Sequence, residues 1–246
     1  MGETTLIHLS RLIALQRKLD VTAQNVANAN TTGFRARELS FREYLKPEKG
    51  VDEAGQRERP LSLTDSRFQF TSVSQGAIER TDNPLDVAIA GEGYLVIQTA
   101  QGERYTRNGA LTLDANGRIL TLDGEPVLGK NGPLQVPLNE GEISISPDGV
   151  VSTRRGSIGQ LRLVSFARPE LLRPAGSSLL RSDQPPTDLA AGKISLVSGA
   201  VEKSNVESTR EMSRLLEITR TYEMVGKLLK SSQDADDINK LANVPD

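Results

Sequence analysis

The chain has 246 residues, a formal net charge of −2, and charged side chains at one quarter of its positions. This nearly neutral balance argues against a basic surface for nucleic acid. The absence of cysteine excludes disulfides and thiolate metal sites. Aromatic content is only 4%, without tryptophan, which suits a thin β domain plus helices that gain stability from neighbours better than a large enzyme core.

The N-terminal residues predict a helix with one continuous stripe of side chains. The spacing alternates between three and four residues, which aims the stripe at a partner helix. Small and polar members of the stripe permit close helix approach and fix the register. The stripe consists of Leu9, Leu12, Gln16, Leu19, Ala23, Val26 and Asn30.

A polar turn is predicted to follow this helix. Asn and Thr favour caps and turns over helix interiors because their short side chains bond nearby backbone groups. Gly33 can take a left-handed conformation without steric cost. We therefore expect the helix to end between Asn28 and Thr32. The turn is defined by Asn25, Asn28, Asn30, Thr31, Gly33 and Phe34.

The middle of the chain reads as an antiparallel β domain. From Leu85 to Ile89 the hydrophobic residues alternate with others, and Gly91-Glu92-Gly93 separates this run from Tyr94–Ile97, so the pair is predicted to form a hairpin. Short apolar runs continue between Asn-Gly and Asp-Gly turn signals. Residues 46–60 are polar and predict a loop.

A second long helix is predicted from Val206 to at least Ser231, with Ser204 or Asn205 as a plausible N-cap. Its stripe repeats the three-and-four spacing of the first helix. The stripe consists of Met212, Leu215, Ile218, Tyr222, Val225 and Leu229.

The predicted fold class is therefore α+β, with terminal helices pairing as a coiled-coil-like stalk and an antiparallel β domain inserted between them. Residues 1–34 and 200–246 are assigned to the terminal helical domain. Residues 35–75 and 180–199 are assigned to extended connecting segments, and residues 76–179 to the central β domain.

No catalytic, cofactor-binding or metal-ligating set is predicted. His8 is the sole histidine and has no cysteine to share a metal with. Carboxylates such as Asp82 and Asp114 could pair for glycoside hydrolysis, but each lies in a turn where Asp has a conformational role. The Gly91-Glu92-Gly93 run is not followed by a helix that could bind phosphate.

Four blocks in order resemble bacterial flagellar rod and hook proteins, and the resemblance covers nearly the whole chain. The blocks are residues 25–34 (NVANANTTGF), 85–94 (LDVAIAGEGY), 105–114 (YTRNGALTLD) and 199–206 (GAVEKSNV), with Arg220-Thr221-Tyr222-Glu223 following. Within the family, the length and central block are most similar to the proximal-rod members, and distal-rod members are close sisters.

This resemblance implies a structural subunit of the basal-body rod rather than an enzyme, with no small-molecule substrate. It implies a periplasmic location and export by the flagellar type III apparatus without a cleaved signal peptide. The expected partners are copies of the chain and other rod proteins, met through the two stripes, with the terminal helices disordered before assembly. A distal-rod or hook-type protein, a secreted β-rich adhesin with a helical stalk, and a carbohydrate-active enzyme remain alternatives.

Overall fold

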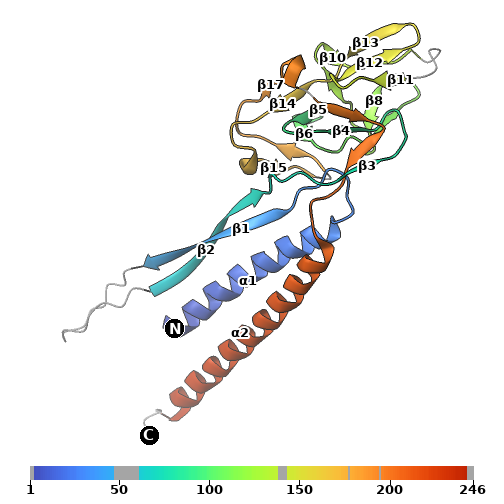
Figure 1. Ribbon diagram of the computed structural model, residues 1–246. Coiled ribbons are helices and arrows are strands. Elements are labelled where there is room, and N and C mark those ends of the chain that lie inside the picture. The colour runs from blue at the N-terminus through green and yellow to red at the C-terminus, as the bar shows by residue number, and fades with distance from the viewer. Residues whose placement is uncertain (1–2, 47–60, 138–142, 177, 194, 243–246) are drawn as a thin grey trace. The chain divides into compact units, whose positions relative to one another are not determined.

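The computed structural model describes residues 3–46, 61–137, 143–176, 178–193 and 195–242. Two long helices near the termini and many short strands between them confirm the α+β class and the antiparallel β middle (Figure 1). The chain divides into two compact units. Unit 1 draws on residues 1–26, 37–69 and 207–246, and unit 2 on residues 27–36 and 70–206.

This grouping differs from the predicted domain boundaries at both ends of the β domain. Residues 27–34 and 200–206 were expected in the helical domain, but they belong to unit 2 with the strands. Residues 180–199 were expected to be a connecting segment, yet they supply strands to unit 2. The physical reason is backbone pairing with strands far away in the sequence, which local composition does not reveal.

Unit 1 contains α1 (Glu3–Ala27), α2 (Ser208–Ala242) and a two-stranded ribbon of β1 (Arg37–Lys46) with most of β2 (Leu61–Thr71). The end of α1 falls one residue before the predicted interval. The polar loop was predicted for residues 46–60, and residues 47–60 of it lie outside the described residues.

The predicted N-cap of the second helix is wrong, because α2 begins at Ser208. The Asn205 side chain instead accepts a hydrogen bond from the Ala36 amide at 2.7 Å and donates to the Ser74 carbonyl at 2.8 Å. The Ser204 hydroxyl accepts from the Val206 amide outside the helix.

Unit 2 is built from small sheets whose described pairings are all antiparallel. The largest sheet has the order β15 (Arg173–Pro174), β16 (Leu180–Arg181), β6 (Gly102–Thr106), β5 (Tyr94–Thr99), β14 (Leu163–Ser165), β17 (Thr187–Asp188). A three-stranded sheet consists of β11 (Ile143–Ile145), β12 (Val150–Thr153) and β13 (Gly156–Gln160).

Four further strand pairs complete unit 2. They are β3 (Ile78–Arg80) with β19 (Ala200–Glu202), β4 (Val87–Ile89) with β18 (Leu196–Ser198), β7 (Leu111–Leu113) with β8 (Ile119–Thr121), and β9 (Leu128–Gly129) with β10 (Gly132–Pro133). Two short 3₁₀ helices, η1 (Pro169–Leu171) and η2 (Ala191–Lys193), lie between strands.

The predicted hairpin between Leu85–Ile89 and Tyr94–Ile97 is wrong in its pairing. Strand β4 pairs with β18, from the far end of the unit, and β5 pairs with β6 and β14. Gly91 and Gly93 both have positive φ, so the chain does turn here as the glycines indicate. The turn leads from β4 into β5, which belongs to the six-stranded sheet.

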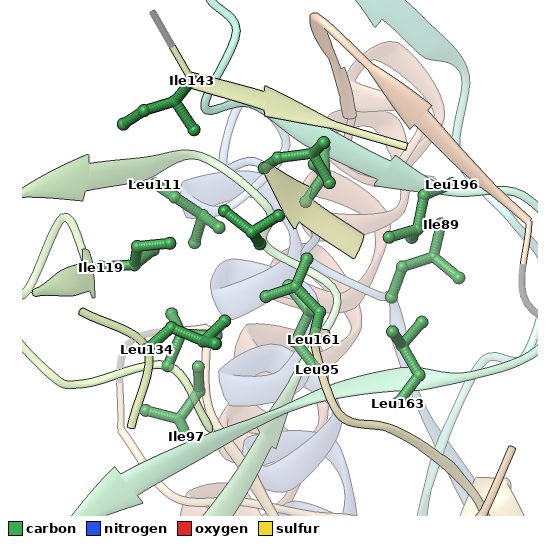
Figure 2. Packing of buried hydrophobic residues seen from close by; sticks show 14 of the residues in the cluster. Ile89, Leu95, Ile97, Leu111, Ile119, Leu134, Ile143, Leu161, Leu163 and Leu196 are labelled. Atoms are coloured by element: carbon green, nitrogen blue, oxygen red, sulfur yellow. The ribbon is translucent and has the colours of Figure 1, made fainter. Parts of the chain in front are cut away.

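The core lies on both faces of β5, as its period of two requires. Leu95 and Ile97 join the larger hydrophobic cluster, while Tyr94 and Val96 join a smaller one with Phe166. Figure 2 shows side chains from several strands converging in the larger cluster. The Phe166 ring meets those of Tyr94 and Tyr105 edge-on, at centroid distances of 5.7 and 4.8 Å.

We expect Leu161→Ala to lower the free energy of unfolding of unit 2 by about 3 kcal/mol, because Leu161 is fully buried in the larger cluster and truncation leaves a cavity. Urea denaturation of the full chain, followed by circular dichroism, measures this loss. Leu122→Ala is the matched control. Its side chain is 69% exposed, and the change should stay within about 0.5 kcal/mol. Equal losses in the two variants would contradict the described core.

Candidate assembly elements and a buried charge cluster

The predicted stripe of α2 coincides with the least exposed side of that helix. Ile218 and Val225 are buried, and Leu215, Tyr222 and Leu229 are half-buried. Met212 is the exception, since it is exposed. The structure thus brings five of the six predicted residues onto one covered face, and their role in assembly stays a prediction.

The buried side of α1 is offset from its predicted stripe. The residues that are buried on α1 are Ala14, Thr22 and Asn25. The members of the predicted stripe differ in exposure. Three are exposed, namely Leu9, Gln16 and Asn30. The other four are half-buried, namely Leu12, Leu19, Ala23 and Val26. Asn30 lies beyond the end of the helix, because α1 stops at Ala27.

Both helices also carry large hydrophobic side chains that are exposed. They are Leu6, Ile7, Leu9 and Ile13 on α1, and Met212, Leu216, Met224 and Leu228 on α2. Single exposed apolar residues are ordinary on a protein surface, but several on one short helix segment mark an interaction site. These eight residues are called the exposed helix faces below.

Asn25 joins three elements of unit 1 rather than shaping the turn. Its amide nitrogen donates to the Glu211 carboxylate of α2 at 3.2 Å and to the Arg37 carbonyl at 3.0 Å. Its amide oxygen accepts from the Arg37 backbone nitrogen at 2.9 Å. Asn25 and Glu211 are both buried, so this hydrogen bond ties the end of α1 to the first turn of α2.

The predicted polar turn itself lies in unit 2. The Thr31 amide donates to the Asn28 carbonyl at 3.1 Å, and the Phe34 amide to the Thr31 carbonyl at 3.2 Å. Gly33 has φ +69°, as predicted, and its amide donates to the Glu202 carbonyl at 2.7 Å. Because a Cβ on Gly33 would lie 2.3 Å from the Asn108 nitrogen, only glycine fits.

A buried charge cluster of Arg35, Arg107 and Glu202 lies at this same place. The Glu202 carboxylate accepts from Arg107 Nε at 2.8 Å, from Arg35 Nη2 at 3.0 Å and from the Gly76 amide at 3.2 Å. The side chains of Arg107 and Glu202 are each only 1% exposed. Charges buried this deeply persist only when they are paired and hydrogen-bonded.

The Arg107 guanidinium makes four hydrogen bonds and an ion pair. Nη1 donates to the carbonyls of Gly91 and Gly93, Nη2 donates to the carbonyl of Ile89, and Nε donates to Glu202. Nη2 also lies 2.6 Å from the Glu202 carboxylate. Burial lowers the pKa of Arg107, and the Glu202 charge opposes that shift. The end of β4 and the turn after it, in which Gly91 and Gly93 have positive φ, therefore direct three backbone carbonyls at one arginine.

A cavity of about 260 Å³ lies beside the cluster, lined in part by Arg35, Tyr94 and Arg107. All three guanidinium nitrogens of Arg107 already donate to protein groups. Within the described residues, no group of three or more His, Asp or Glu side chains could hold a metal ion. None of the described helices is long and apolar enough to cross a membrane.

The sequence patterns did not predict the charge cluster, although its members lie in or next to the four blocks that resemble the rod and hook proteins. Arg35 directly follows the polar turn, Arg107 lies in the block 105–114, and Glu202 lies in the block 199–206. One feature of the sequence could have pointed to this cluster. Its three charged residues lie within a few positions of a glycine, in or next to the blocks that resemble one family.

Comparison with known proteins gives three matched family models in chain order. The flagella basal body rod protein model matches residues 6–35, the flagellar hook protein FlgE/F/G D1 domain matches 88–153, and the flagellar basal body rod FlgEFG protein C-terminal model matches 197–241. The matched ranges include all three members of the charge cluster.

Several curated relatives match over most of their length. The flagellar basal-body rod protein FlgF of Rhizobium meliloti is 34% identical over 230 residues, 92% of each chain, and FlgF of Escherichia coli is 34% identical over 229 residues, 87% of each. The rod protein FlgG of Bacillus subtilis is 32% identical over 248 residues, covering 92% of this chain and 93% of its own.

Terminal helices, the family turn and the inserted β unit together define an axial structural protein of the flagellum, not an enzyme. The chain belongs to the flagellar basal-body rod protein family and is FlgF-like in sequence. It is thus a structural subunit of the rod that assembles with other rod proteins, and an adhesin role has no support.

We expect Gly33→Ala to destabilise unit 2 by about 3 kcal/mol, because the new Cβ collides with the backbone of residues 107–108 and the positive φ strains alanine. Gly124→Ala is the control: its φ is +87° but nothing lies within 4 Å of its Cβ, so strain alone should cost about 1 kcal/mol. Thermal unfolding of both variants measures the difference. A Gly33 variant no worse than the Gly124 variant would refute the close approach.

Arg107→Lys should lower the stability of unit 2 by about 3 kcal/mol although the charge is kept. Lysine has three donors instead of five, so buried carbonyls at Ile89, Gly91 or Gly93 lose their partner. The control Arg118→Lys changes a half-exposed pair with Asp114 and should stay within about 1 kcal/mol. Urea titration of both variants decides. An equal stability loss in the two variants would contradict the importance of the hydrogen bonds that Arg107 makes to the three carbonyls.

Proposed function

We propose that the chain assembles helically through its terminal helices, as part of the torque-transmitting shaft and export channel of the rod. The observation that carries this proposal is the pair of exposed helix faces, on α1 and on α2. One partner helix cannot cover apolar surface on this many sides, so further helices from other subunits must. Copies that stack about an axis through unlike surfaces make an open-ended, heterologous contact.

In this proposal α1 and α2 of one subunit pair as a coiled-coil-like stalk. The buried hydrogen bond between Asn25 and Glu211 supports it, because it links the two helices within unit 1. The burial of Ile218 and Val225, seven residues apart, also supports it, since that is one heptad. Polar and small residues in the first stripe, such as Gln16 and Ala23, then set the register.

The proposed location is the periplasmic rod, reached through the flagellar type III export apparatus. Support comes from the names of the relatives, all basal-body rod proteins. Self-association and contact with the export apparatus belong to the same proposal. Membership among the proximal-rod subunits is supported by the FlgF relatives at 33–34% identity.

A distal-rod or hook-type role is the second candidate. It is favoured by the match to a domain shared by FlgE, FlgF and FlgG, and by the 32% identity to FlgG of Bacillus subtilis. Deleting the gene and isolating basal bodies separates the two candidates. A proximal subunit leaves the distal rod and hook missing, whereas a distal one leaves the proximal rod in place.

Met212→Glu combined with Leu216→Glu should abolish swimming while leaving the monomer folded. Both side chains are about half exposed, so the monomer loses little packing, whereas an interface would bury two uncompensated charges. Motility in soft agar and the melting temperature of the purified chain provide the two readouts. The matched control is Ser213→Glu, which adds a charge at a neighbouring exposed position. Normal swimming by the double variant would count against the proposed interface.

We also expect the terminal helices to be poorly ordered in the free monomer. Helices whose apolar faces lack neighbours gain little stability from packing, so ordering is completed on assembly. Amides of α1 and α2 should therefore exchange with deuterium at least about tenfold faster than those of β5 and β6. Comparable protection in helices and sheet would show that the subunit is ordered before it assembles.

A further inference from the structure

Unit 2 is completed by two segments from opposite ends of the chain. Residues 27–36 precede its first strand and residues 196–206 follow its last 3₁₀ helix. They are called the closing segments here. They bond to each other directly: the Gly33 amide donates to the Glu202 carbonyl at 2.7 Å, and the Ala36 amide donates to the Asn205 side chain at 2.7 Å.

The closing segments share a charge that neither can bury alone. Arg35 belongs to the first segment and Glu202 to the second, and their side chains are 6% and 1% exposed. Without Glu202, both Arg35 and Arg107 would be buried with no carboxylate to accept their N–H groups. Without the arginines, the Glu202 carboxylate would be buried unpaired. Each loss carries the large penalty of an uncompensated buried charge.

The six-stranded sheet does not depend on the closing segments for its strands. Its members all lie between Tyr94 and Asp188, so they can pair before either segment arrives. In contrast, β18 pairs only with β4 and β19 pairs only with β3 among the described strands. The second segment also buries Leu196, Ala200 and Val201 as it docks.

We infer that the closing segments form one cooperative latch, which docks on the preformed sheet as a unit, with Glu202 as the charge that both halves require. Opening the latch separates Arg35 from Glu202 and removes the hydrogen bond on Gly33. Opening also frees the turn after β4, because Arg107 binds the Gly91 and Gly93 carbonyls and Glu202 together. The two ends therefore open together or not at all.

This inference has a consequence that rests on the proposed function. In a subunit exported with its N-terminus leading, residues 27–36 emerge long before residue 202. The polar turn then remains undocked until almost all of unit 2 has passed. The chain stays open during transit and closes once, near the end.

Native-state hydrogen exchange on the unmodified full chain, at low denaturant concentrations, tests the latch. The reporters are the amides of Gly33, Thr81 and Lys203, which bond the Glu202, Gly199 and Ala77 carbonyls. We expect the three to merge into one opening reaction, with protection at least about tenfold below that of β5–β6 amides. Openings that differ by more than tenfold among the three, or that match the sheet, would overturn the latch.

Two variants test whether the latch depends on the charge of Glu202. Glu202→Gln keeps the shape of the side chain but removes the charge. The control Glu79→Gln removes an exposed carboxylate on β3 that pairs at 3.1 Å with Lys203, the residue directly after β19. Glu202→Gln should lower protection at Gly33 and Lys203 by the same factor, at least about tenfold, with β5–β6 amides unchanged.

Two results with Glu202→Gln would contradict the latch. One is loss of protection at Lys203 while Gly33 keeps its own, and the other is an equal loss throughout the sheet. If the variant does not fold, the exchange measurement on the unmodified chain still decides. None of these outcomes bears on rod membership, which swimming and basal-body composition test separately.

Discussion

Pairing of two buried guanidinium groups with one shared carboxylate is the constraint on which unit 2 depends. Glu202 accepts hydrogen bonds from Arg35, Arg107 and the Gly76 amide, so four distant parts of the chain are fixed around one side chain. A buried ion pair does not by itself prove high stability, because desolvation offsets much of the attraction. It does favour this arrangement over those that separate Glu202 from the arginines, since these leave a buried carboxylate unpaired.

Local patterns in the sequence predicted the elements well and their partners poorly. The three-and-four spacing placed Leu215, Ile218 and Val225 on the covered side of α2, and Gly33 has its expected positive φ. The supposed hairpin after Leu85 failed, because a glycine turn does not say which strand comes next to which. The pairing of β4 with β18 joins residues more than 100 positions apart in the chain, and no local signal carries that.

The charge cluster was hidden for a different reason. Arginine and glutamate are usually found at protein surfaces, so a single sequence gives no reason to bury Arg107 or Glu202. Their burial follows from tertiary structure, in which the carbonyls of the turn at Gly91 and Gly93 meet one guanidinium. The offset stripe of α1 has a similar origin. Asn25 was predicted to shape the turn, but it lies within α1 with its side chain buried. Hydrogen bonds to Glu211 and Arg37 make that burial possible.

The polar turn and the last strand of unit 2 meet where the Gly33 amide donates one backbone hydrogen bond to the Glu202 carbonyl. Because unit 2 consists of two stretches of the chain, residues 27–36 and 70–206, with residues 37–69 of unit 1 between them, the unit can be exchanged for a relative's only when both stretches are replaced together. A chimeric axial protein made in this way must take the arginine of the first stretch together with the arginine and glutamate of the second, since Glu202 pairs with Arg35 and with Arg107.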